Sequence, residues 1–444
     1  MKAFHSLSCA WVAFLFSALV AGAQGKYKNV ELWIDHADGR YQKNENVQVW
    51  ATRLVDDGEK LFLTVRTNGQ KEKKPLDLTV GEKTLILNQE YADPTAVILQ
   101  VTPGSDNKIY STIGFIVAAE EFRPGFDEPE DFMTFWQKQV KTMRKSKMKS
   151  KLTPVELTDG LKKYANDVEA YDLEISMPEG NPVRAYIAWP KDADARSCSI
   201  LICPHGSGVR TSNLSNAVRR AKSLHAIVID INAHGILNGQ SDEYYKALNE
   251  GELKNYRTVD LTDREACYFR LMYLRMQRVL DYACSLKLWN KEKVALEGMS
   301  QGGAQSAALA GLDPRVKYVV LQVPAVTDLG GTLVGHSGSW PYYGKFKEER
   351  DGDYQHILPY YDAANFLRHY SGTLVVEAGL TDTTCGSECV FAAYNVSPST
   401  DKTIATNPYR HHSAKGLWEE NAKVWRETID KPRKDALANY LKED

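Results

Sequence analysis

The chain has 444 residues, of which 43% are hydrophobic and 25% are charged, and its formal net charge is −2. This composition is typical of a globular protein with a sizeable core, and the length predicts two or three domains. Because the charge is nearly balanced, nothing in the composition favours binding to nucleic acid or to an acidic membrane surface.

Residues 1–23 predict a secretory signal peptide. Lys2 precedes an apolar run that extends from Ala10 to Val20, and Ala21-Gly22-Ala23 is a small-residue cleavage site. The run is too short to span a membrane, and no later run reaches about 18 apolar residues, so we expect no membrane insertion. The sequence therefore predicts a secreted or periplasmic protein.

Six cysteines remain after the predicted cleavage. Export permits disulfides, but Cys385 and Cys389 have a helical spacing that rarely suits one, so the disulfide pattern stays open. We expect Cys198 and Cys203 to be core thiols. No C-x-x-C pair is present, so we expect neither a zinc site nor a redox site. We also expect no cofactor.

Residues 24–120 are predicted to form a small β-sandwich of the immunoglobulin-like kind. Short segments alternate apolar and polar residues, and the turn sequences Asp38-Gly39, Asn68-Gly69 and Pro103-Gly104 separate some of them. Short strands at this spacing favour two packed antiparallel sheets. We see no cluster of catalytic residues in this part of the chain.

Two features of this predicted sandwich allow more than one interpretation. We expect Trp33 and Trp50 in its core, the alternative being a surface platform on which a sugar ring stacks. We expect the charged run Lys71–Lys74 in a solvated loop.

Residues 121–444 are predicted to form an α/β domain. A helix is expected to begin near Pro129 and to run into the basic stretch Lys141–Lys151, which we expect to be solvated. From about Asp172 a hairpin is followed by strands that alternate with helices. The continuously apolar strands are Ser199–Cys203, Ala226–Asp230, Lys293–Glu297, Tyr318–Gln322 and Leu374–Glu377. Such strands predict a mostly parallel sheet covered by helices on both faces, with ligands bound beyond the carboxyl ends of the strands.

A candidate nucleophile follows the third of these strands. Gly298-Met299-Ser300-Gln301-Gly302 is a G-x-S-x-G sequence between an apolar strand and a helix-forming segment. In that context the serine sits on a sharp turn with its hydroxyl exposed, and the glycines avoid collisions with neighbouring backbone. The pentapeptide alone also fits an ordinary strand-to-helix turn.

A serine hydroxyl needs a base, and the base needs an acid that orients it. Asp382 directly follows the strand that ends near Glu377, and His411 and His412 follow the next apolar stretch, so the chain order Ser, Asp, His is the expected one. Residue chemistry alone does not decide between the two histidines. Asp328 and Asp362 are rival acids, but neither directly follows an apolar strand.

The tetrahedral intermediate would need two backbone donors for its oxyanion. One is the amide of Gln301, which follows the nucleophile. The other is predicted in the loop after an earlier strand, Cys203-Pro204-His205-Gly206-Ser207, and we expect it to be the amide of Ser207. We expect His205 to brace this loop without any acid–base role.

From about Arg123 onward the chain resembles the acetyl xylan esterase / cephalosporin C deacetylase family of α/β-hydrolases. The motifs that carry the resemblance are Phe132–Trp136, His205-Gly206, Gly298–Gly303, Leu358–Phe366, and Gly379–Cys385 followed by Val390–Asn395. The resemblance implies that His412 is the base, and that sugars are deacetylated through an acyl-enzyme without a metal.

Three positions depart from the family pattern. Ser207 stands where the family has an aromatic residue, Asn232-Ala233-His234 stands where it has Arg-Gly-Gln, and Ser413 stands where it has Glu. These departures concern the pocket rather than Ser300, Asp382 and His412, and they leave the substrate and the oligomeric state open.

A cap over the site is predicted at about residues 330–356, which are rich in turn-forming and aromatic residues. Within it, Trp340 is our candidate for a pocket wall that stacks on a sugar ring. An ordinary loop anchor is the alternative role for this side chain.

Taken together, the sequence predicts a secreted serine esterase that acts on an acetylated carbohydrate or a small acetyl ester. Ser300, His412 and Asp382 are the predicted catalytic residues. The rival hypotheses are a serine peptidase of the prolyl-oligopeptidase type and a non-catalytic carbohydrate-binding protein. The roughly 95 residues before the α/β domain are too few for the peptidase's propeller, whose blades take about 40 residues each.

Overall fold

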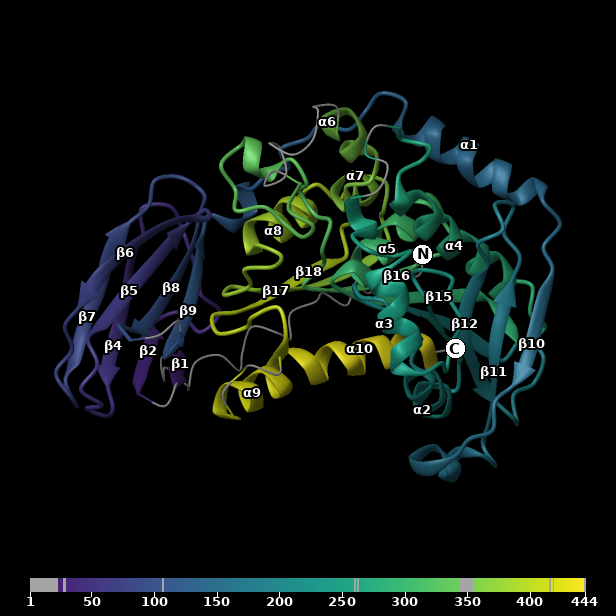
Figure 1. The fold of residues 1–444 in the computed structure, drawn as a ribbon, viewed down its shortest axis with the longest axis horizontal. Coiled ribbons are helices and arrows are strands. Elements are labelled where there is room, and N and C mark those ends of the chain that lie inside the picture. Colours follow the sequence, from purple (N-terminus) through teal and green to yellow (C-terminus); the bar gives the residue numbers. More distant parts are fainter. Residues whose placement is uncertain are drawn as a thin grey trace, which may run out of the picture.

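The computed structural model describes residues 23–26, 29–105, 108–258, 261, 263–343, 354–414, 417 and 419–442. The predicted signal peptide, apart from Ala23, lies outside these residues, and so do residues 344–353 of the predicted cap. A β-sandwich lies on the left in Figure 1, and a larger body built on a central sheet lies on the right.

Two small sheets form the sandwich, in the strand orders β1-β2-β4-β7 and β3-β9-β8-β5-β6. The first contains β1 (Ala23–Lys26), β2 (Val30–Ile34), β4 (Asn46–Arg53) and β7 (Lys83–Glu90), and the second contains β3 (Arg40–Tyr41), β5 (Leu61–Thr67), β6 (Gln70–Leu76), β8 (Thr95–Pro103) and β9 (Ser111–Val117). All pairings are antiparallel except the short one between β3 and β9. Fully buried side chains such as Leu32, Val49, Leu63 and Val97 fill the space between the sheets.

The expectation that Trp33 and Trp50 are core residues is wrong. Leu32 and Ile34 point into the core, and because side chains alternate along a strand, Trp33 points outward. It stacks on Trp50, its cross-strand partner, with ring centroids 5.5 Å apart. Both rings are half-buried, and Nζ of Lys83 lies 3.6 Å from the centroid of the Trp33 ring.

The charged run Lys71–Lys74 belongs to strand β6 and not to a loop. Its side chains are exposed, as expected, because β6 is the edge strand of its sheet and has no buried face. Charged residues at such an edge also discourage pairing with another chain.

The larger body is organised around a nine-stranded sheet in the order β10-β11-β12-β14-β13-β15-β16-β17-β18. Its strands are β10 (Ser150–Pro154), β11 (Val168–Ile175), β12 (Val183–Pro190), β13 (Cys198–Pro204), β14 (Ile227–Ile231), β15 (Trp289–Met299), β16 (Tyr318–Gln322), β17 (Thr373–Gly379) and β18 (Lys402–Asn407). The predicted hairpin is β11 and β12, and the strands from β14 to β18 in the sheet order are all parallel. This is the mostly parallel sheet that the sequence predicted.

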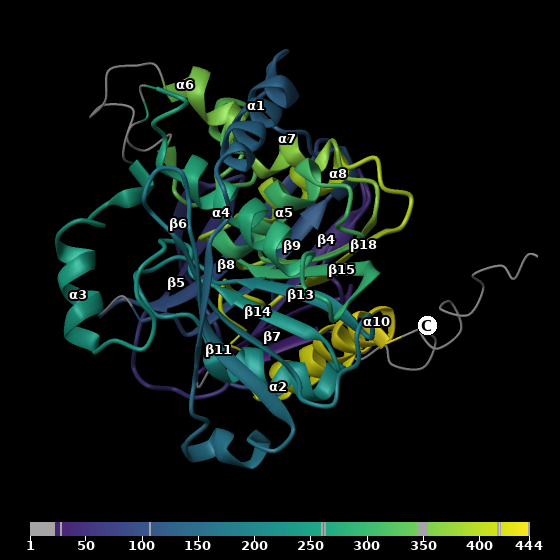
Figure 2. The same ribbon diagram turned by 90° about the vertical axis from the view of Figure 1, so that its right-hand side faces the viewer.

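Helices cover both faces of this sheet (Figures 1 and 2). The helices are α1 (Phe132–Lys145), α2 (Leu214–Leu224), α3 (Asp242–Glu250), α4 (Tyr268–Ala283), α5 (Gln301–Leu312), α6 (Tyr354–Ile357), α7 (Ala363–Leu367), α8 (Ser387–Asn395), α9 (Glu419–Trp425) and α10 (Lys431–Lys442). α4, α5, α7 and α8 lie above the sheet in Figure 1, and α2 and α10 lie below it. None of the helices in the described ranges is long and apolar enough to cross a membrane.

All six described cysteines are free and buried. Cys198 and Cys203 lie in the central strand β13, so the prediction that they are core thiols is confirmed. Burial raises the pKa of the Cys203 thiol to about 12.

The sandwich packs directly on two loops of the larger body. The amide of Gly114 in β9 donates to the carbonyl of Pro408 at 2.8 Å, and an ideal Cβ on Gly114 would lie only 2.0 Å from the carbonyl oxygen of Leu380. Tyr409 is buried in the sandwich core, where its hydroxyl contacts the carbonyl of Leu32 at 3.4 Å. The loops after β17 and β18 are therefore held by the sandwich.

Candidate active site

Ser300 sits on a sharp turn between β15 and α5, with φ of 57° and ψ of −125°. An ideal Cβ on Gly298 would lie 2.1 Å from the carbonyl oxygen of Gly302, and one on Gly302 would lie 2.2 Å from that of Pro204. Both positions therefore require glycine. The amide of Ser300 donates to the carbonyl of Gln322 in the neighbouring strand at 3.0 Å, which fixes the turn against the sheet.

The structure brings Ser300, His412 and Asp382 together at the carboxyl end of the sheet. Oγ of Ser300 lies 2.9 Å from Nε2 of His412, and Nδ1 of His412 lies 2.8 Å from Oδ2 of Asp382. With the proton of His412 on Nδ1, that nitrogen donates to Asp382 and Nε2 accepts from the serine hydroxyl. The other oxygen of Asp382 accepts from the amides of Thr384 and Cys385, so the carboxylate is fixed on both sides.

His411, the alternative base, points elsewhere. Its Nδ1 lies 3.1 Å from Oγ1 of Thr381, and burial lowers its pKa. The rival acid Asp362 accepts from the amides of Asp328, Leu329 and Ala364 and so caps α7. Burial and the neighbouring Asp328 raise the pKa of Asp362 to about 7.

A buried ion-pair network holds the His412 loop, and the sequence did not predict it. Nη1 of Arg410 donates to the carbonyls of His411 and His412, and its Nε donates to Glu377 at 2.8 Å. Arg433 of α10 pairs with the same carboxylate. Arg410 and Glu377 are each 1% exposed. The only sequence signal was an arginine directly before the two histidines.

The loop after β13 is braced by Asn232-Ala233-His234, one of the three positions that depart from the family pattern. Nδ1 of His205 donates to the carbonyl of Gly206, and its Nε2 accepts from the amide of Ala233 at 3.2 Å. His234 bonds the carbonyl of Gly208, and Asn232 bonds the carbonyl of Arg210. The prediction that His205 braces the loop is confirmed, and Asn232 and His234 serve the same purpose.

Burial keeps both of these histidines neutral near pH 7. It lowers the pKa of His205 to about 4 and that of His234 to about 3. Each ring therefore carries one proton and acts as donor through one nitrogen and as acceptor through the other.

The two predicted oxyanion donors are available. Gln301 is the first residue of α5, so its amide has no partner within the helix. Neither this amide nor that of Ser207 donates a hydrogen bond to any described group. Ser207 and Ser300 line the same cavity.

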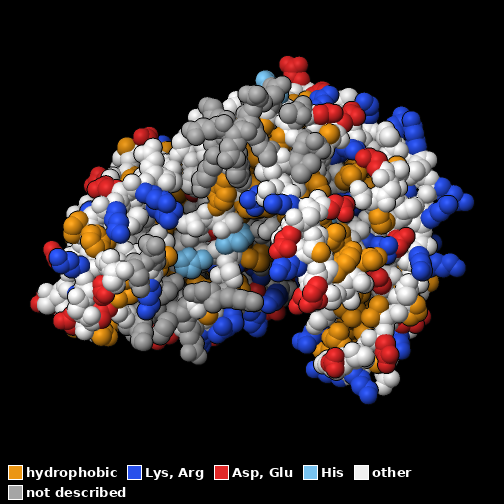
Figure 3. Space-filling model, viewed as in Figure 1, with side chains coloured by type: hydrophobic (Ala, Val, Ile, Leu, Met, Phe, Trp, Pro, Cys, Tyr) orange, Lys and Arg blue, Asp and Glu red, His pale blue; other side chains and the backbone are white. Residues whose placement is uncertain are grey.

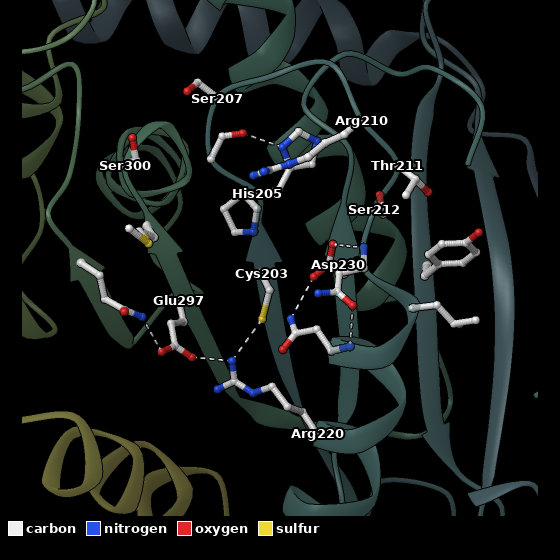
Figure 4. A pocket seen from close by; sticks show the side chains of 18 of the residues that line it. Cys203, His205, Ser207, Arg210, Thr211, Ser212, Arg220, Asp230, Glu297 and Ser300 are labelled. Carbon is white, nitrogen blue, oxygen red and sulfur yellow. Dashed lines mark hydrogen bonds and ion pairs between the residues drawn. The ribbon is translucent and has the colours of Figure 1, made fainter. Parts of the chain in front are cut away.

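This cavity has a volume of about 1030 Å³ and opens at the carboxyl end of the strands. Figure 3 shows a hollow in this face of the molecule, with histidine side chains inside it and charged side chains around its edge. In Figure 4, Ser207, Ser300 and His205 lie at one end and Arg220 and Glu297 at the other. The cavity is far larger than an acetyl group, and most of the residues that line it are polar or charged.

Trp340 does not line this cavity in the described part of the chain. Its ring packs near Tyr256 and Phe269, with centroids 6.5 and 6.3 Å away. Its amide donates to the carbonyl of Thr384, and its carbonyl accepts from the amide of Val326. The structure therefore favours a loop anchor for Trp340 over a sugar-stacking wall.

Two groups of described side chains bring three metal-ligating atoms within 4.8 Å of one another. One is Asp382, Cys385 and His412, and the other is Asp328, His336 and Cys389. In each group the histidine and the aspartate already bond to each other, at 2.8 and 2.5 Å. We therefore interpret both as hydrogen-bonded pairs.

Comparison with known proteins identifies the family that the larger body matches. A model of the acetyl xylan esterase (AXE1) family matches residues 117–428, which excludes nearly all of the sandwich. The curated acetyl esterase Axe7A of Xylanibacter ruminicola is 28% identical over 304 residues, which cover 68% of this chain. The match spans 66% of that relative's length.

Two solved structures share the fold of the larger body. The acetyl xylan esterase from Paenibacillus sp. R4 is 23% identical with a TM-score of 0.58, and the alignment covers 70% of this chain and 98% of that one. Acetyl xylan esterase 1 from Thermoanaerobacterium sp. JW/SL YS485 is 21% identical with a TM-score of 0.59, and the alignment covers 72% of this chain and 97% of that one. Because the family model matches well over half of the chain, the protein belongs to the acetyl xylan esterase family of α/β-hydrolases, a family of carboxylic ester hydrolases, as its motifs had predicted.

Proposed function

We propose that this protein is an exported serine esterase that removes acetyl, or another small acyl group, from carbohydrates. The observation that carries the proposal is the chain of hydrogen bonds from Ser300 through His412 to Asp382, together with the amides of Gln301 and Ser207, which donate to no group that the structure describes. Family membership supports ester hydrolysis, and the predicted signal peptide supports export.

The first half of the reaction acylates the enzyme. Oγ of Ser300 attacks the ester carbonyl while Nε2 of His412 takes its proton, and the carbonyl oxygen becomes an oxyanion held by the amides of Gln301 and Ser207. Asp382 stabilises the imidazolium that forms. His412 then gives its proton to the sugar oxygen, the carbon–oxygen bond breaks, and the sugar leaves with a free hydroxyl group.

The second half releases the acid. His412 takes a proton from water, the resulting hydroxide attacks the acyl carbonyl, and the same two amides hold the second oxyanion. When this intermediate collapses, the acyl group leaves as acetate and Ser300 recovers its proton from His412. No step requires a cofactor.

The test is hydrolysis of 4-nitrophenyl acetate by wild type and by Ser300→Ala. We expect the variant to lose at least about 10⁴-fold in kcat, because the nucleophile is absent. His412→Asn should lose at least about 10³-fold. His411→Asn, which removes the neighbouring ring directed at Thr381, is the matched control and should retain most of the activity. Full activity in Ser300→Ala would refute the proposal.

The rival functions have separate assays. A fluorophosphonate probe should label wild type at Ser300, whereas a non-catalytic carbohydrate-binding protein would not react. A dipeptide anilide should not be cleaved, although a peptidase of the prolyl-oligopeptidase type would cleave it. Acetate release from a panel of acetylated polysaccharides and small acetyl esters then identifies the substrate class.

A further inference from the structure

Among the described residues, Arg210 is the cation of the cavity wall that forms no ion pair. It is exposed, and its guanidinium makes no hydrogen bond or ion pair with any described group. The other three cations that line the cavity are all paired. Arg220 bonds Glu297, and Arg433 and Lys434 both bond Asp430.

The acids of the cavity wall are fully engaged elsewhere. Asp230 accepts from the amide of Asn213 through one oxygen and from the side chain of Asn216 through the other. Glu297 bonds Gln322 as well as Arg220. Arg210 interacts electrostatically with Asp230, but no described carboxylate in this wall forms a hydrogen bond or an ion pair with it.

The backbone that carries Arg210 is held in place. Its carbonyl accepts from Nδ2 of Asn232 at 2.8 Å, and the amide of Ser212 donates to Asn238 at 3.0 Å. His205 and His234, which brace the same loop, are neutral, since burial lowers the pKa of both rings. Arg210 is thus the one permanent positive charge at this end of the cavity among the described side chains, and it is carried by a backbone that is held in place.

Arg210 also lies close to the nucleophile. An ideal Cβ on Gly206 would lie 3.6 Å from Nη2 of Arg210 and 3.7 Å from Cβ of Ser300. The missing side chain of Gly206 therefore leaves a small open volume between the guanidinium and the reacting serine. Figure 4 shows Arg210 at the same end of the cavity as Ser207 and Ser300.

We propose that Arg210 binds a carboxylate of the substrate, so that the enzyme prefers esters with an acidic group close to the scissile bond. A carboxylate in this position would repel the developing oxyanion unless a cation paired with it, and a guanidinium pairs with carboxylates through two parallel hydrogen bonds. The inference deepens the proposed function and rests on it, because it requires the ester carbonyl at Ser300.

Two sources of that carboxylate have the same chemistry. It belongs either to the alcohol, as in an acetylated hexuronic acid, or to the acyl group, as in the half-ester of a dicarboxylic acid. The sugar arm of the test compares methyl glucuronoside monoacetates with methyl glucoside monoacetates. The acyl arm compares monoethyl succinate with ethyl butyrate. In each arm, kcat/KM of the acidic ester is divided by that of its neutral counterpart.

We expect wild type to favour the acidic ester in one arm and Arg210→Gln to lower that ratio about tenfold, the effect of losing one charge-assisted contact. Raising the ionic strength to about 0.5 M should also lower the wild-type ratio, because the site is exposed. Arg219→Gln is the matched control. It removes the same charge from an exposed residue of α2 outside this cavity, and its ratio should equal that of wild type.

A ratio that stays the same in Arg210→Gln in both arms would overturn the inference. An equal loss of kcat/KM for acidic and neutral esters in Arg210→Gln would also overturn the inference. Such a result would mean that Arg210 affects the hydrolysis of every ester and does not recognise the carboxylate. Failure of the proposed function is distinguishable, since wild type would then hydrolyse none of the four esters.

Discussion

At the scale of single residues, the buried Arg410 fixes the loop that carries His412, the proposed base. Its guanidinium connects the carbonyls of His411 and His412 to the buried carboxylate of Glu377, which Arg433 also binds. A lysine at this position would keep the charge but lose the fork that reaches several acceptors at once.

We therefore predict that Arg410→Lys lowers the free energy of unfolding by about 2 kcal/mol, because Glu377 and the loop carbonyls lose charge-assisted hydrogen bonds. It should also lower kcat more than it raises KM, because Nε2 of His412 would no longer be held against Ser300. Urea unfolding and steady-state kinetics with 4-nitrophenyl acetate measure the two effects. Arg53→Lys, in an ion pair of the sandwich, is the comparison, and equal losses of kcat in both variants would contradict this role.

At the scale of elements, the braced loop after β13 makes the fold sensitive to acid. The pKa of His205 is lowered from 6.5 in the unfolded chain to about 4 in the fold, because burial disfavours the charged ring. Below pH 6.5 the unfolded chain binds a proton that the folded protein does not, so stability falls as the pH decreases from 6.5 towards 4.

The predicted contribution of His205 is about 3 kcal/mol across this interval, since one pKa unit corresponds to about 1.4 kcal/mol. Urea unfolding at several pH values between 4.5 and 7.5 should show a shallower loss of stability in His205→Gln than in wild type. His225→Asn changes an exposed histidine and is the control. Parallel pH profiles for wild type and His205→Gln would rule out this contribution.

The order of strands and helices explains which residues of the candidate site the sequence could predict. Ser300, Asp382 and the pair His411 and His412 were predicted because each follows an apolar stretch, and parallel strands place their carboxyl ends at one edge. The resemblance to the family then selected His412. The network of Glu377, Arg410 and Arg433 was missed because its members meet only through the packing of α10 against the sheet. The residues that neighbour each of these side chains in the sequence do not indicate such long-range pairs.

The orientation of Trp33 was misjudged for a different reason. An aromatic residue was assumed to be buried, although the alternation of Val30, Leu32 and Ile34 already placed Trp33 on the opposite face. Trp340 was likewise judged by residue type, whereas its backbone hydrogen bonds to other loops decide its place. Periodicity was the better guide in the sandwich, and only tertiary contacts place the predicted cap.

At the scale of the whole molecule, the sandwich supports the loops that carry Asp382 and His412. Gly114 allows β9 to approach the carbonyl of Leu380, two residues before Asp382, and it bonds Pro408 in the loop that leads to His412. We predict that Gly114→Ala, whose Cβ would overlap the Leu380 carbonyl, lowers kcat by about 10- to 100-fold, since small displacements of catalytic groups are costly.

Steady-state kinetics on variants that remain folded by circular dichroism measure this effect. Gly160→Ala, where a Cβ would meet nothing within 4 Å, is the control. A Gly114→Ala variant with wild-type kcat would mean that the sandwich does not position the two loops.

The burial of Tyr409 in the sandwich core has a consequence for the timing of activity during synthesis. Domains near the amino terminus fold first as the chain emerges from the ribosome. Here the sandwich core stays incomplete until Tyr409 arrives, and Glu377 lacks its second arginine until Arg433 has followed. We therefore expect the His412 loop to gain its fixed position against Ser300 only after the segment through Arg433 has been made, because the sandwich, this loop and α10 hold one another.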